Sequence, residues 1–319
     1  MDIDVLRAAE LLQAADDITI LAHQKPDGDT LGASFGLLYA LQSIGKRCRV
    51  LCSDGYPGRY GFIYGSYQPE EFEEQFVVAV DLADAQLMGS LREQYEPRVD
   101  LCIDHHLSNS RYAKENLVRP NAAAACELMH RIIMNMGIKL NPQIATAFYT
   151  GLSTDTGCFR FANTTASSHI CAAELIGAGA DFALVNRLMF ETVSLERMKI
   201  ELKIKSSLEL AFGGKCAVMY ITDEMLEGTD ISDYDLEGTA NLPRQIEGVE
   251  VGILIRERKT EEECRVSLRS SREVDVSKVA AGFGGGGHVR AAGCTLKGTP
   301  REVRDALLAG LKDVMEQLA

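Results

Sequence analysis

Residues 18–34 have the sequence ITILAHQKPDGDTLGAS. The stretch begins with a short apolar run, residues 18–22, which predicts a buried strand. Pro26 and Gly28 predict a tight turn after that strand, and a helical pattern begins near Leu31. A strand that leads through a tight turn into a helix is the first half of a βαβ unit. This stretch therefore predicts an α/β fold with a parallel sheet.

Three more apolar runs repeat this pattern in the first half of the chain. They lie at residues 48–52, 76–80 and 99–103, and helical patterns at residues 5–15 and 31–44 accompany them. Ligands bind at the carboxyl ends of the strands in an open parallel sheet, so polar side chains that follow these runs should share one edge. Those side chains are His23, Asp27, Asp29, Asp81, Asp104, His105 and His106.

The composition of the 319 residues excludes several classes of protein. Hydrophobic residues make up 46% and charged residues 25%, as is typical of a soluble globular protein, and the length predicts two domains. The net charge of −13 would repel long duplex nucleic acid and an anionic membrane surface. A phosphorylated substrate must therefore be attracted locally, by metal ions or by a few cations.

The nine cysteines contain no C-x-x-C pair, which predicts reduced thiols rather than a zinc ribbon or a redox motif. The first residues do not include a basic segment followed by an apolar one, so we expect no signal peptide. No apolar run approaches the ~18 residues that a membrane span needs. We therefore expect a cytoplasmic protein.

The second half of the chain changes from helical patterns to strand patterns. Helical patterns lie at residues 122–136, 142–153, 166–178 and 195–212. Strand patterns follow at residues 216–221, 249–256 and 264–268, and a last helix begins near Arg301. The change predicts a domain at residues 1–190, a helical linker at residues 191–213 and a smaller α/β domain at residues 214–319.

The polar side chains at the predicted sheet edge are suited to binding metal ions. A further carboxylate, Asp155, follows a helical pattern in the sequence GLSTD. Two divalent ions that share one carboxylate can place an attacking nucleophile in line with phosphorus. Imidazole and carboxylate donors without a thiolate favour Mn²⁺ over Zn²⁺.

Each of these motifs alone also has a purely structural interpretation. Asp27 and Asp81 are each in position to cap a helix N-terminus, and Gly157 is in position to end a helix. We interpret Asp84 as such a cap. The glycines at residues 284–287 alone would fit a flexible linker.

Together and in this order, the motifs resemble the DHH phosphoesterase superfamily, which includes RecJ exonucleases and family II inorganic pyrophosphatases. The motifs are residues 23–34, Asp81, Asp104-His105-His106 and residues 151–157. Residues 267–270 and 283–293 resemble the DHH-associated domain of the nanoRNase/pAp phosphatase group. The resemblance covers essentially the whole chain and implies a catalytic DHH domain followed by a substrate-binding domain.

The resemblance implies two Mn²⁺ ions in the active site, with Mg²⁺ or Co²⁺ as substitutes. The first ion would be held by His23, Asp27 and Asp81. The second would be held by Asp29, Asp81, His105 and Asp155. Asp81 would then bridge the two ions. His106 would contact the scissile phosphate as a catalytic residue, and Asp104 would support the histidines.

The resemblance also implies a binding surface for the far phosphate or nucleotide of the substrate. Arg269 and His288 would bind that group, and the backbone amides of the glycine cluster would approach it closely. The full predicted set is Asn109, Arg269, Ser270, Gly285, Gly286, Gly287, His288 and Arg290. Val289 stands where relatives often carry proline or another residue, a departure that leaves His288 and Arg290 in place.

The activity that the resemblance implies is Mn²⁺-dependent hydrolysis of short oligonucleotides such as pApA to mononucleotides, with pAp as a second candidate substrate. A cyclic-dinucleotide phosphodiesterase is the first alternative, although such relatives often carry membrane and sensory segments. Inorganic pyrophosphatase fits less well, because the glycine cluster suits a nucleotide-sized substrate. A non-catalytic nucleotide sensor is the alternative from another class. A homodimer is compatible with all of these.

Overall fold

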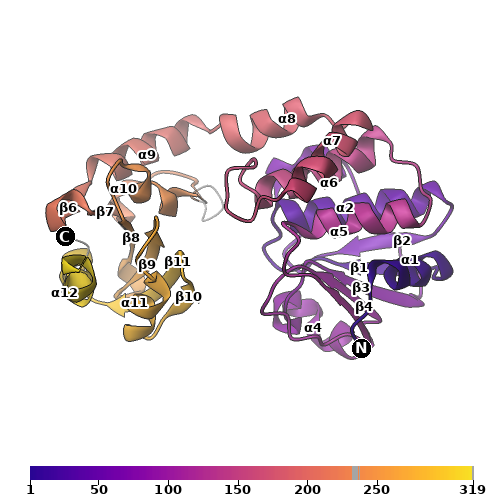
Figure 1. Cartoon of the computed structure of the whole chain (residues 1–319), viewed down its shortest axis with the longest axis horizontal. Helices are drawn as coiled ribbons and strands as arrows, with labels where there is room; N and C mark the ends of the chain where they lie inside the picture. The colour runs from indigo at the N-terminus through magenta and orange to yellow at the C-terminus, as the bar shows by residue number, and fades with distance from the viewer. Residues whose placement is uncertain (232–235, 237, 318–319) are drawn as a thin grey trace. The chain divides into compact units, whose positions relative to one another are not determined.

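The computed structural model describes residues 1–231, 236 and 238–317. The chain divides into two compact units, Met1–Thr192 and Val193–Ala319 (Figure 1). The division at residue 192 lies close to the boundary predicted near residue 190. Each unit has its own sheet and its own hydrophobic core, as separate domains do.

A five-stranded parallel sheet forms the centre of the first unit, with the strand order β2-β1-β3-β4-β5. Its strands are β1 Ile18–Leu21, β2 Cys48–Leu51, β3 Phe76–Val80, β4 Leu101–Asp104 and β5 Glu115–Val118. This arrangement confirms the predicted parallel α/β fold. Because β1, β3 and β4 are neighbours, the loops that follow them lie together at one edge of the sheet.

Helices cover both faces of this sheet. They are α1 Val5–Ala14, α2 Gly28–Ser43, α3 Gly61–Tyr64, α4 Arg92–Tyr95, α5 Ala125–Asn135, α6 Pro142–Asp155, α7 Ala166–Gly177 and α8 Phe182–Asn186. Figure 1 shows α2, α5 and α6 on one side of the sheet and α4 on the other. Ile18 and Ile20 of β1 pack in the core beneath α2, whereas Val77 and Ala79 of β3 pack in the core with Tyr95 of α4.

Helices α2 and α6 approach each other closely because α2 carries glycines where the two helices meet. A Cβ at Gly28 would lie 2.4 Å from Oγ1 of Thr154, and a Cβ at Gly32 would lie 2.4 Å from the carbonyl oxygen of Ala147. Only glycine permits contacts this short. The close packing holds the end of α6, which carries Asp155, beside the beginning of α2.

The second unit has a six-stranded sheet with the order β10-β11-β9-β8-β7-β6, in which only β7 and β8 pair in parallel. The strands are β6 Glu209–Ala211, β7 Cys216–Ile221, β8 Val251–Arg258, β9 Glu263–Ser270, β10 Gly286–His288 and β11 Ala291–Lys297. The helices are α9 Leu195–Ser206, α10 Asp223–Leu226, α11 Val276–Gly282 and α12 Pro300–Glu316. This second sheet completes the predicted pair of α/β domains.

The segment 195–212, predicted as one helix, is helical only as far as Ser206. The hydroxyl of Ser207 donates to the carbonyl of Ile204 at 2.6 Å, and residues 209–211 form the edge strand β6. Ile200 and Ile204 of α9 are buried in one core with Leu254 of β8. Helix α9 therefore packs as part of the second unit and covers one face of its sheet.

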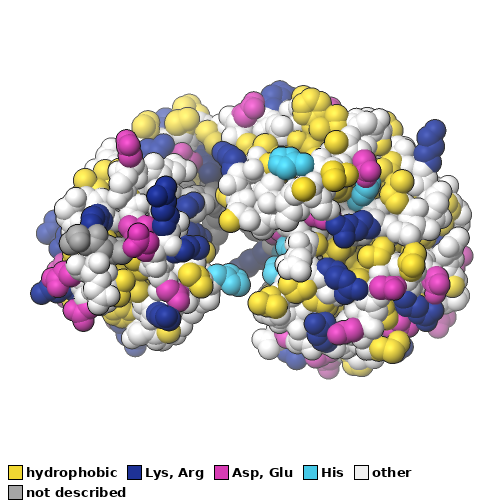
Figure 2. Space-filling model, in the orientation of Figure 1, with side chains coloured by type: hydrophobic (Ala, Val, Ile, Leu, Met, Phe, Trp, Pro, Cys, Tyr) yellow, Lys and Arg dark blue, Asp and Glu magenta, His cyan; other side chains and the backbone are white. Residues whose placement is uncertain are grey.

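The surface carries charges of both signs, and acidic and basic side chains are interspersed in the view of Figure 2. No helix in the described ranges is long and apolar enough to cross a membrane. The nine cysteines are free thiols, as predicted, and most of them are buried.

Candidate metal centre

The loops after β1, β3 and β4 bring histidine and aspartate side chains together. Asp27 caps α2, since its Oδ1 accepts hydrogen bonds from two amides of the first helical turn, each at 3.0 Å. Nδ1 of His23 donates to the carbonyl of Gln24 at 2.7 Å, which leaves the lone pair of Nε2 available to a cation. Nε2 faces Oδ1 of Asp27 at 4.0 Å and Oδ2 of Asp81 at 3.9 Å.

Asp81 follows β3 and lies in the middle of the site. Its φ of 54° falls in the left-handed region, which is uncommon for residues other than glycine and often marks functional sites. Oδ2 accepts a hydrogen bond from Oγ1 of Thr30 at 2.7 Å. Oδ1 is buried and has no hydrogen-bond partner among the described residues. Because a buried carboxylate oxygen without a partner is costly, this atom is a good candidate to bind a cation.

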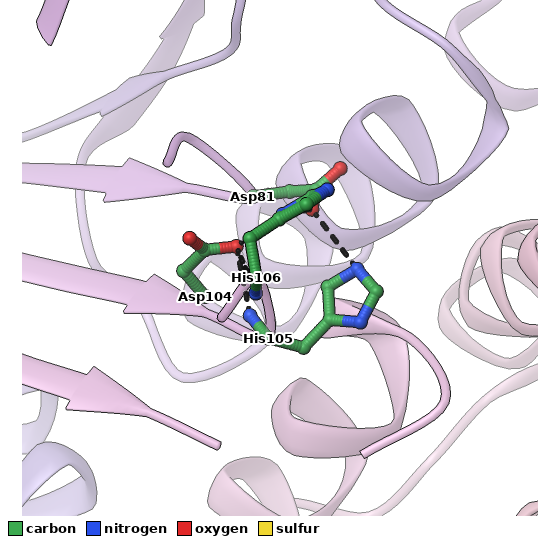
Figure 3. Close-up of side chains that lie close together, drawn as sticks. All are labelled: Asp81, Asp104, His105 and His106. Atoms are coloured by element: carbon green, nitrogen blue, oxygen red, sulfur yellow. Dashed lines mark hydrogen bonds and ion pairs between the residues drawn. The ribbon is translucent and has the colours of Figure 1, made fainter. Parts of the chain in front are cut away.

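His105 and His106 follow β4 and contact different partners (Figure 3). Nε2 of His105 lies 3.5 Å from Oδ1 of Asp81. Nδ1 of His106 donates to Oδ1 of Asp104 at 2.8 Å, and the same oxygen accepts hydrogen bonds from both histidine amides. The fully buried Asp104 therefore orients the His106 ring and the backbone that carries both histidines.

Asn109 completes the hydrogen bonding of Asp104. Its Nδ2 donates to Oδ2 of Asp104 at 2.7 Å. Burial alone would raise the pKa of Asp104, but the hydrogen bonds from His106 and Asn109 hold that pKa below its ordinary value. The side chain predicted to contact a phosphate thus donates to a carboxylate in this structure, and we interpret Asn109 as a positioning residue.

A second group of ligands surrounds Nε2 of His105. This atom lies 3.3 Å from Oδ2 of Asp155 and 3.7 Å from Oδ2 of Asp29. Nδ1 of the same ring donates to the carbonyl of Ala122 at 3.2 Å, so Nε2 is the atom left to face the carboxylates. Three side chains from three different segments of the chain therefore meet at this point.

The backbone of residues 122–126 orients two members of this second group. Besides the contact from Ala122 to His105, the amides of Ala125 and Cys126 donate to the two carboxylate oxygens of Asp29, at 2.6 and 2.9 Å. Glu127 holds the segment in place by accepting from the amide of Ala123 at 3.2 Å. The conformation of these residues thus determines where His105 and Asp29 point.

Besides the set Asp81, Asp104, His105 and His106, the side chains form two groups that fit metal ions. In each group, one nitrogen or oxygen atom per residue lies within 4.8 Å of the others. The first group is His23, Asp27 and Asp81. The second is Asp29, His105 and Asp155. The first group has the residues expected for the first ion, and the second has those expected for the second ion except Asp81. Oδ1 of Asp81 lies 3.5 Å from Nε2 of His105, a member of the second group.

The charges of the second group are poorly compensated without a cation. Burial and the neighbouring Asp81 carboxylate raise the pKa of Asp29 to about 7. Burial and the Asp29 carboxylate raise the pKa of Asp155 well above its ordinary value. Burial alone would lower the pKa of His105, but Asp81 and Asp29 raise it to about 10. Carboxylates that retain protons this strongly, together with the partnerless oxygen of Asp81, fit a site for hard divalent cations.

Sequence reasoning missed Thr30, residues 122–126 and Glu127. A threonine hydroxyl and backbone amides carry no signal of their own in a sequence. The run of alanines at residues 122–125 even suggests a helix from residue 122, because alanine has the highest helix propensity. The helix instead begins at Ala125, which leaves residues 121–124 in a non-helical turn that contacts the ligands.

In the second unit, Arg269 and His288 lie on one face of the sheet. Ala291 pairs with Arg269 of β9 on one side and with His288 of β10 on the other. Cross-strand neighbours of this kind point to the same face. Leu268, next to Arg269 in the strand, belongs to the core on the opposite face. Arg269 and His288 thus share the face that does not pack against α11 and α12.

Ser270 and Arg290 are placed differently from the expectation. Ser270 is buried, because it is on the core side of β9, and its hydroxyl donates to the carbonyl of Val289 at 3.4 Å. Arg290 is exposed and donates to the carbonyl of Val274 at 3.2 Å. We interpret Ser270 as a residue that stabilises the hairpin between β10 and β11.

The glycine cluster is part of this hairpin rather than a free loop. A Cβ at Gly285 would lie 2.1 Å from the carbonyl oxygen of Gly293, and a Cβ at Gly287 would lie 2.6 Å from that of Ala291. These two glycines are therefore required by the close approach of β11. A Cβ at Gly286 would meet nothing within 4 Å, so packing does not explain glycine at that position.

Two comparisons with known proteins decide the family. Residues 17–152 match the N-terminal domain of the DHH family, and residues 213–317 match the DHHA1 domain. A bifunctional oligoribonuclease and PAP phosphatase NrnA of Thermus thermophilus is 35% identical over 301 residues, which cover 91% of this chain and 87% of that protein. This chain belongs to the DHH family. These matches confirm the predicted resemblance. As a member of the DHH family, this protein is an enzyme of the hydrolase class.

Solved and more distant relatives agree with this assignment. The crystal structure of an exopolyphosphatase-related protein from Bacteroides fragilis is similar to the DHH chain with a TM-score of 0.88 and 26% identity, over 98% of this chain and 97% of that one. A cyclic-di-AMP phosphodiesterase GdpP of Geobacillus thermodenitrificans is 25% identical over 339 residues, which cover 96% of this chain and 49% of that protein. The DHH fold therefore extends over both units.

Proposed function

We propose that this DHH-family enzyme is a phosphodiesterase that uses two divalent metal ions to hydrolyse short oligonucleotides to mononucleotides. The observation that carries the proposal is the pair of ligand groups that meet at Asp81. Divalent ions at these groups would supply positive charge for a phosphate and an activated water for its hydrolysis. Such a local positive centre would also attract an anionic substrate to a chain of net charge −13.

We propose His106 as the residue that contacts the scissile phosphate. Its side chain is 46% exposed, whereas that of His105 is 12% exposed. Because Nδ1 of His106 is bonded to Asp104, its Nε2 is the ring atom left to contact a substrate. The Asp104 contact raises the pKa of His106, which favours the protonated form that can stabilise a developing negative charge or protonate a leaving group.

We propose Mn²⁺ as the preferred ion, with Mg²⁺ and Co²⁺ as substitutes. The candidate ligands are imidazole nitrogens and carboxylate oxygens, and no thiol belongs to either group in the described residues. Mixed nitrogen and oxygen donors of this kind suit Mn²⁺ better than ions that prefer sulfur.

The class of substrate is proposed from the relatives. The NrnA relative is by name an oligoribonuclease and PAP phosphatase, and its likeness extends over both units. Arg269, His288 and the Gly286 backbone in the second unit offer a surface for a nucleotide or a phosphate. A second candidate function is cyclic-di-AMP hydrolysis, which is favoured by the likeness to GdpP, although this chain spans about half of that protein.

A panel of substrates tests the proposal directly. The purified enzyme with Mn²⁺ is incubated with pApA, a 5-mer RNA, a 24-mer RNA, cyclic di-AMP, pAp and pyrophosphate, and the products are separated by chromatography. We expect rapid loss of pApA and of the 5-mer, slower loss of pAp, and a spared 24-mer. Preference for cyclic di-AMP would favour the second function. Nucleotide binding without any hydrolysis would make the chain a sensor and overturn the proposal.

A further inference from the structure

Asn163 bonds to two parts of the backbone that determine how the second ligand group is arranged. That group is Asp29, His105 and Asp155. Nδ2 of Asn163 donates to the carbonyl of Asp155 at 3.1 Å and to the carbonyl of Ala123, also at 3.1 Å. The amide of Asn163 has two hydrogens, and each is therefore used on a backbone oxygen of the site.

The contact with Ala123 reaches the segment that orients two of the three ligands. Within residues 122–126, backbone atoms bond to Nδ1 of His105 and to both carboxylate oxygens of Asp29. A displacement of Ala123 would therefore move the atoms that hold both side chains. The other contact reaches the third ligand, Asp155, through its own backbone. One amide group thus restrains all three members of the second ligand group.

The first ligand group is positioned by other contacts. Asp27 is held by the amides that it caps at the beginning of α2, and the ring of His23 is held by a carbonyl of its own loop. Asp81 accepts a hydrogen bond from Thr30. In the described ranges, Asn163 makes no hydrogen bond to any of these residues. Removal of Asn163 should therefore disturb one ligand group and spare the other.

The chain returns toward Asp155 through an unusual turn. The φ values of Gly157, Cys158 and Phe159 are 57°, 57° and 61°, all in the left-handed region, which is uncommon for residues other than glycine. A Cβ at Gly157 would lie 2.4 Å from the ring of Phe161, so the turn requires glycine there. Backbone strain of this kind is maintained only where the surrounding structure enforces it, and it is often found at functional sites.

Packing and hydrogen bonds hold this turn in place. The ring of Phe159 stacks on that of His169 in α7, with centroids 5.0 Å apart and an interplanar angle of 25°. The amide of Phe159 donates to Oγ1 of the buried Thr156 at 3.1 Å. The turn reverses the chain and brings Asn163 back against the end of α6, where Asp155 lies.

We propose that Asn163 is a positioning residue that determines the geometry of the second ligand group and so the affinity of the ion bound there. The inference rests on the proposed two-ion function and adds that one ion can be weakened without the other. Asn163 acts through the backbone of Asp155 and of residues 122–126. Without its amide, two carbonyl oxygens lose their donor, and the segments that carry the ligands are no longer bonded to each other.

Titration with Mn²⁺ alone tests this role without a substrate, and the electron paramagnetic resonance signal of free Mn²⁺ follows the binding. Asn163→Leu keeps the approximate volume of the side chain and removes both donors. We expect one ion to bind within about twofold of its wild-type affinity and the other about 10- to 100-fold more weakly. The matched control is Asn135→Leu, because Asn135 is also exposed and its Nδ2 donates to a helix carbonyl, that of Arg131, at 2.8 Å. It should leave both affinities unchanged.

Two ligand variants identify the ion that responds. His23→Gln removes a ligand of the first group, and Asp155→Asn removes one of the second. In the His23→Gln background, Asn163→Leu should weaken the remaining ion by the same factor as in the wild type. In the Asp155→Asn background it should have no further effect. The reverse pattern, or equal weakening of both ions, would overturn the positioning role.

The titration also separates this inference from the proposed activity. If the wild type binds two ions but hydrolyses none of the substrates in the panel, the activity is wrong and the role of Asn163 stands. A wild type that binds fewer than two ions would overturn both. Because Asn163 is exposed, the Tm of Asn163→Leu in EDTA should lie within about 5 °C of the wild-type value. Should this variant not fold, Asn163→Ala removes the same two donors and takes its place.

Discussion

Oδ1 of Asp81 lies 3.5 Å from Nε2 of His105 and has no hydrogen-bond partner among the described residues. Oδ2 of the same carboxylate lies 3.9 Å from Nε2 of His23. One carboxylate thus faces a histidine of each ligand group. This is the arrangement expected of a ligand shared by two metal ions.

Thr30 should support metal binding through its hydrogen bond to Oδ2 of Asp81. Thr30→Val keeps the shape of the side chain and removes the donor, so we expect Mn²⁺ affinity to fall by about 10- to 100-fold. Calorimetric titration with Mn²⁺ measures this change. The matched control is Thr150→Val, because Thr150 is equally buried but its hydroxyl donates only to the carbonyl of Thr146. Equal Mn²⁺ affinities in the two variants would contradict the role of Thr30.

The site should make metal binding strengthen as the pH rises. The folded-state pKa of Asp29, about 7, lies above its ordinary 3.8, and that of His105, about 10, lies above its ordinary 6.5. At a pH below the ordinary pKa of each group, binding of its proton stabilises the folded metal-free chain fully. This stabilisation is lost as the pH rises through the folded-state pKa of that group. The metal-free chain should therefore become less stable from about pH 4 upward on account of these two groups.

Metal ions must displace the same protons from Asp29 and His105. The stabilisation that the metal ions give should therefore increase as the pH rises. We expect the rise in Tm caused by Mn²⁺ to be larger at about pH 8 than at about pH 6. Thermal unfolding with Mn²⁺ or with EDTA at both pH values measures it. A rise in Tm that is equal at both pH values, or larger at the lower one, would show that these protons do not compete with the metal.

Glu127 should stabilise the segment that orients His105 and Asp29. Besides the amide of Ala123, its carboxylate accepts hydrogen bonds from Arg131 and Ser167. Glu127→Gln should lower the free energy of unfolding by about 1–3 kcal/mol and also weaken Mn²⁺ binding. Urea unfolding and Mn²⁺ titration measure the two effects. Glu174→Gln removes an exposed carboxylate that lies 3.2 Å from Nε2 of His130, a contact that the glutamine oxygen can still make, and should change stability by less than about 0.5 kcal/mol. Normal metal affinity in the Glu127 variant would exclude a positioning role.

Two neighbouring glycines should respond differently to alanine. At Gly285 the added Cβ would lie 2.1 Å from a carbonyl oxygen, so Gly285→Ala should destabilise the second unit by about 1–3 kcal/mol. At Gly286 the space is open, so Gly286→Ala should fold normally but raise the KM for pApA with little change in kcat. Thermal unfolding measures the loss of stability in Gly285→Ala, and steady-state kinetics measure the change in KM in Gly286→Ala. Wild-type kinetics in a folded Gly286→Ala variant would show that no substrate approaches this strand.

Much of the fold is predictable because a buried parallel strand is a continuous apolar run. Strand β3 matches its predicted ends, and β7 does so as well. Strand β10 is not predictable, because two glycines and a histidine show no alternation of polar and apolar side chains. Its conformation depends on pairing with β11. Strand β5 is missed for a related reason, since half of its four residues are polar.

The candidate ligands are predictable because their side chains carry the chemistry and follow apolar runs. Tertiary packing brings these ligands together. The glycines of α2 pack against α6 and so place Asp155 beside Asp29. Ser270 shows a limit of the sequence pattern, because neighbours in a strand point to opposite faces and its buried side chain lies on the other face of β9 from Arg269.

The most direct test of the account is Asp81→Asn, with bound Mn²⁺ and pApA turnover measured on the same samples. Asparagine tolerates the left-handed backbone of this position, so the variant should fold. We predict two Mn²⁺ ions per wild-type chain, and in the variant the loss of at least one ion and of turnover by about 10³-fold. A variant that binds two ions and hydrolyses pApA at the wild-type rate would contradict the shared-carboxylate metal centre.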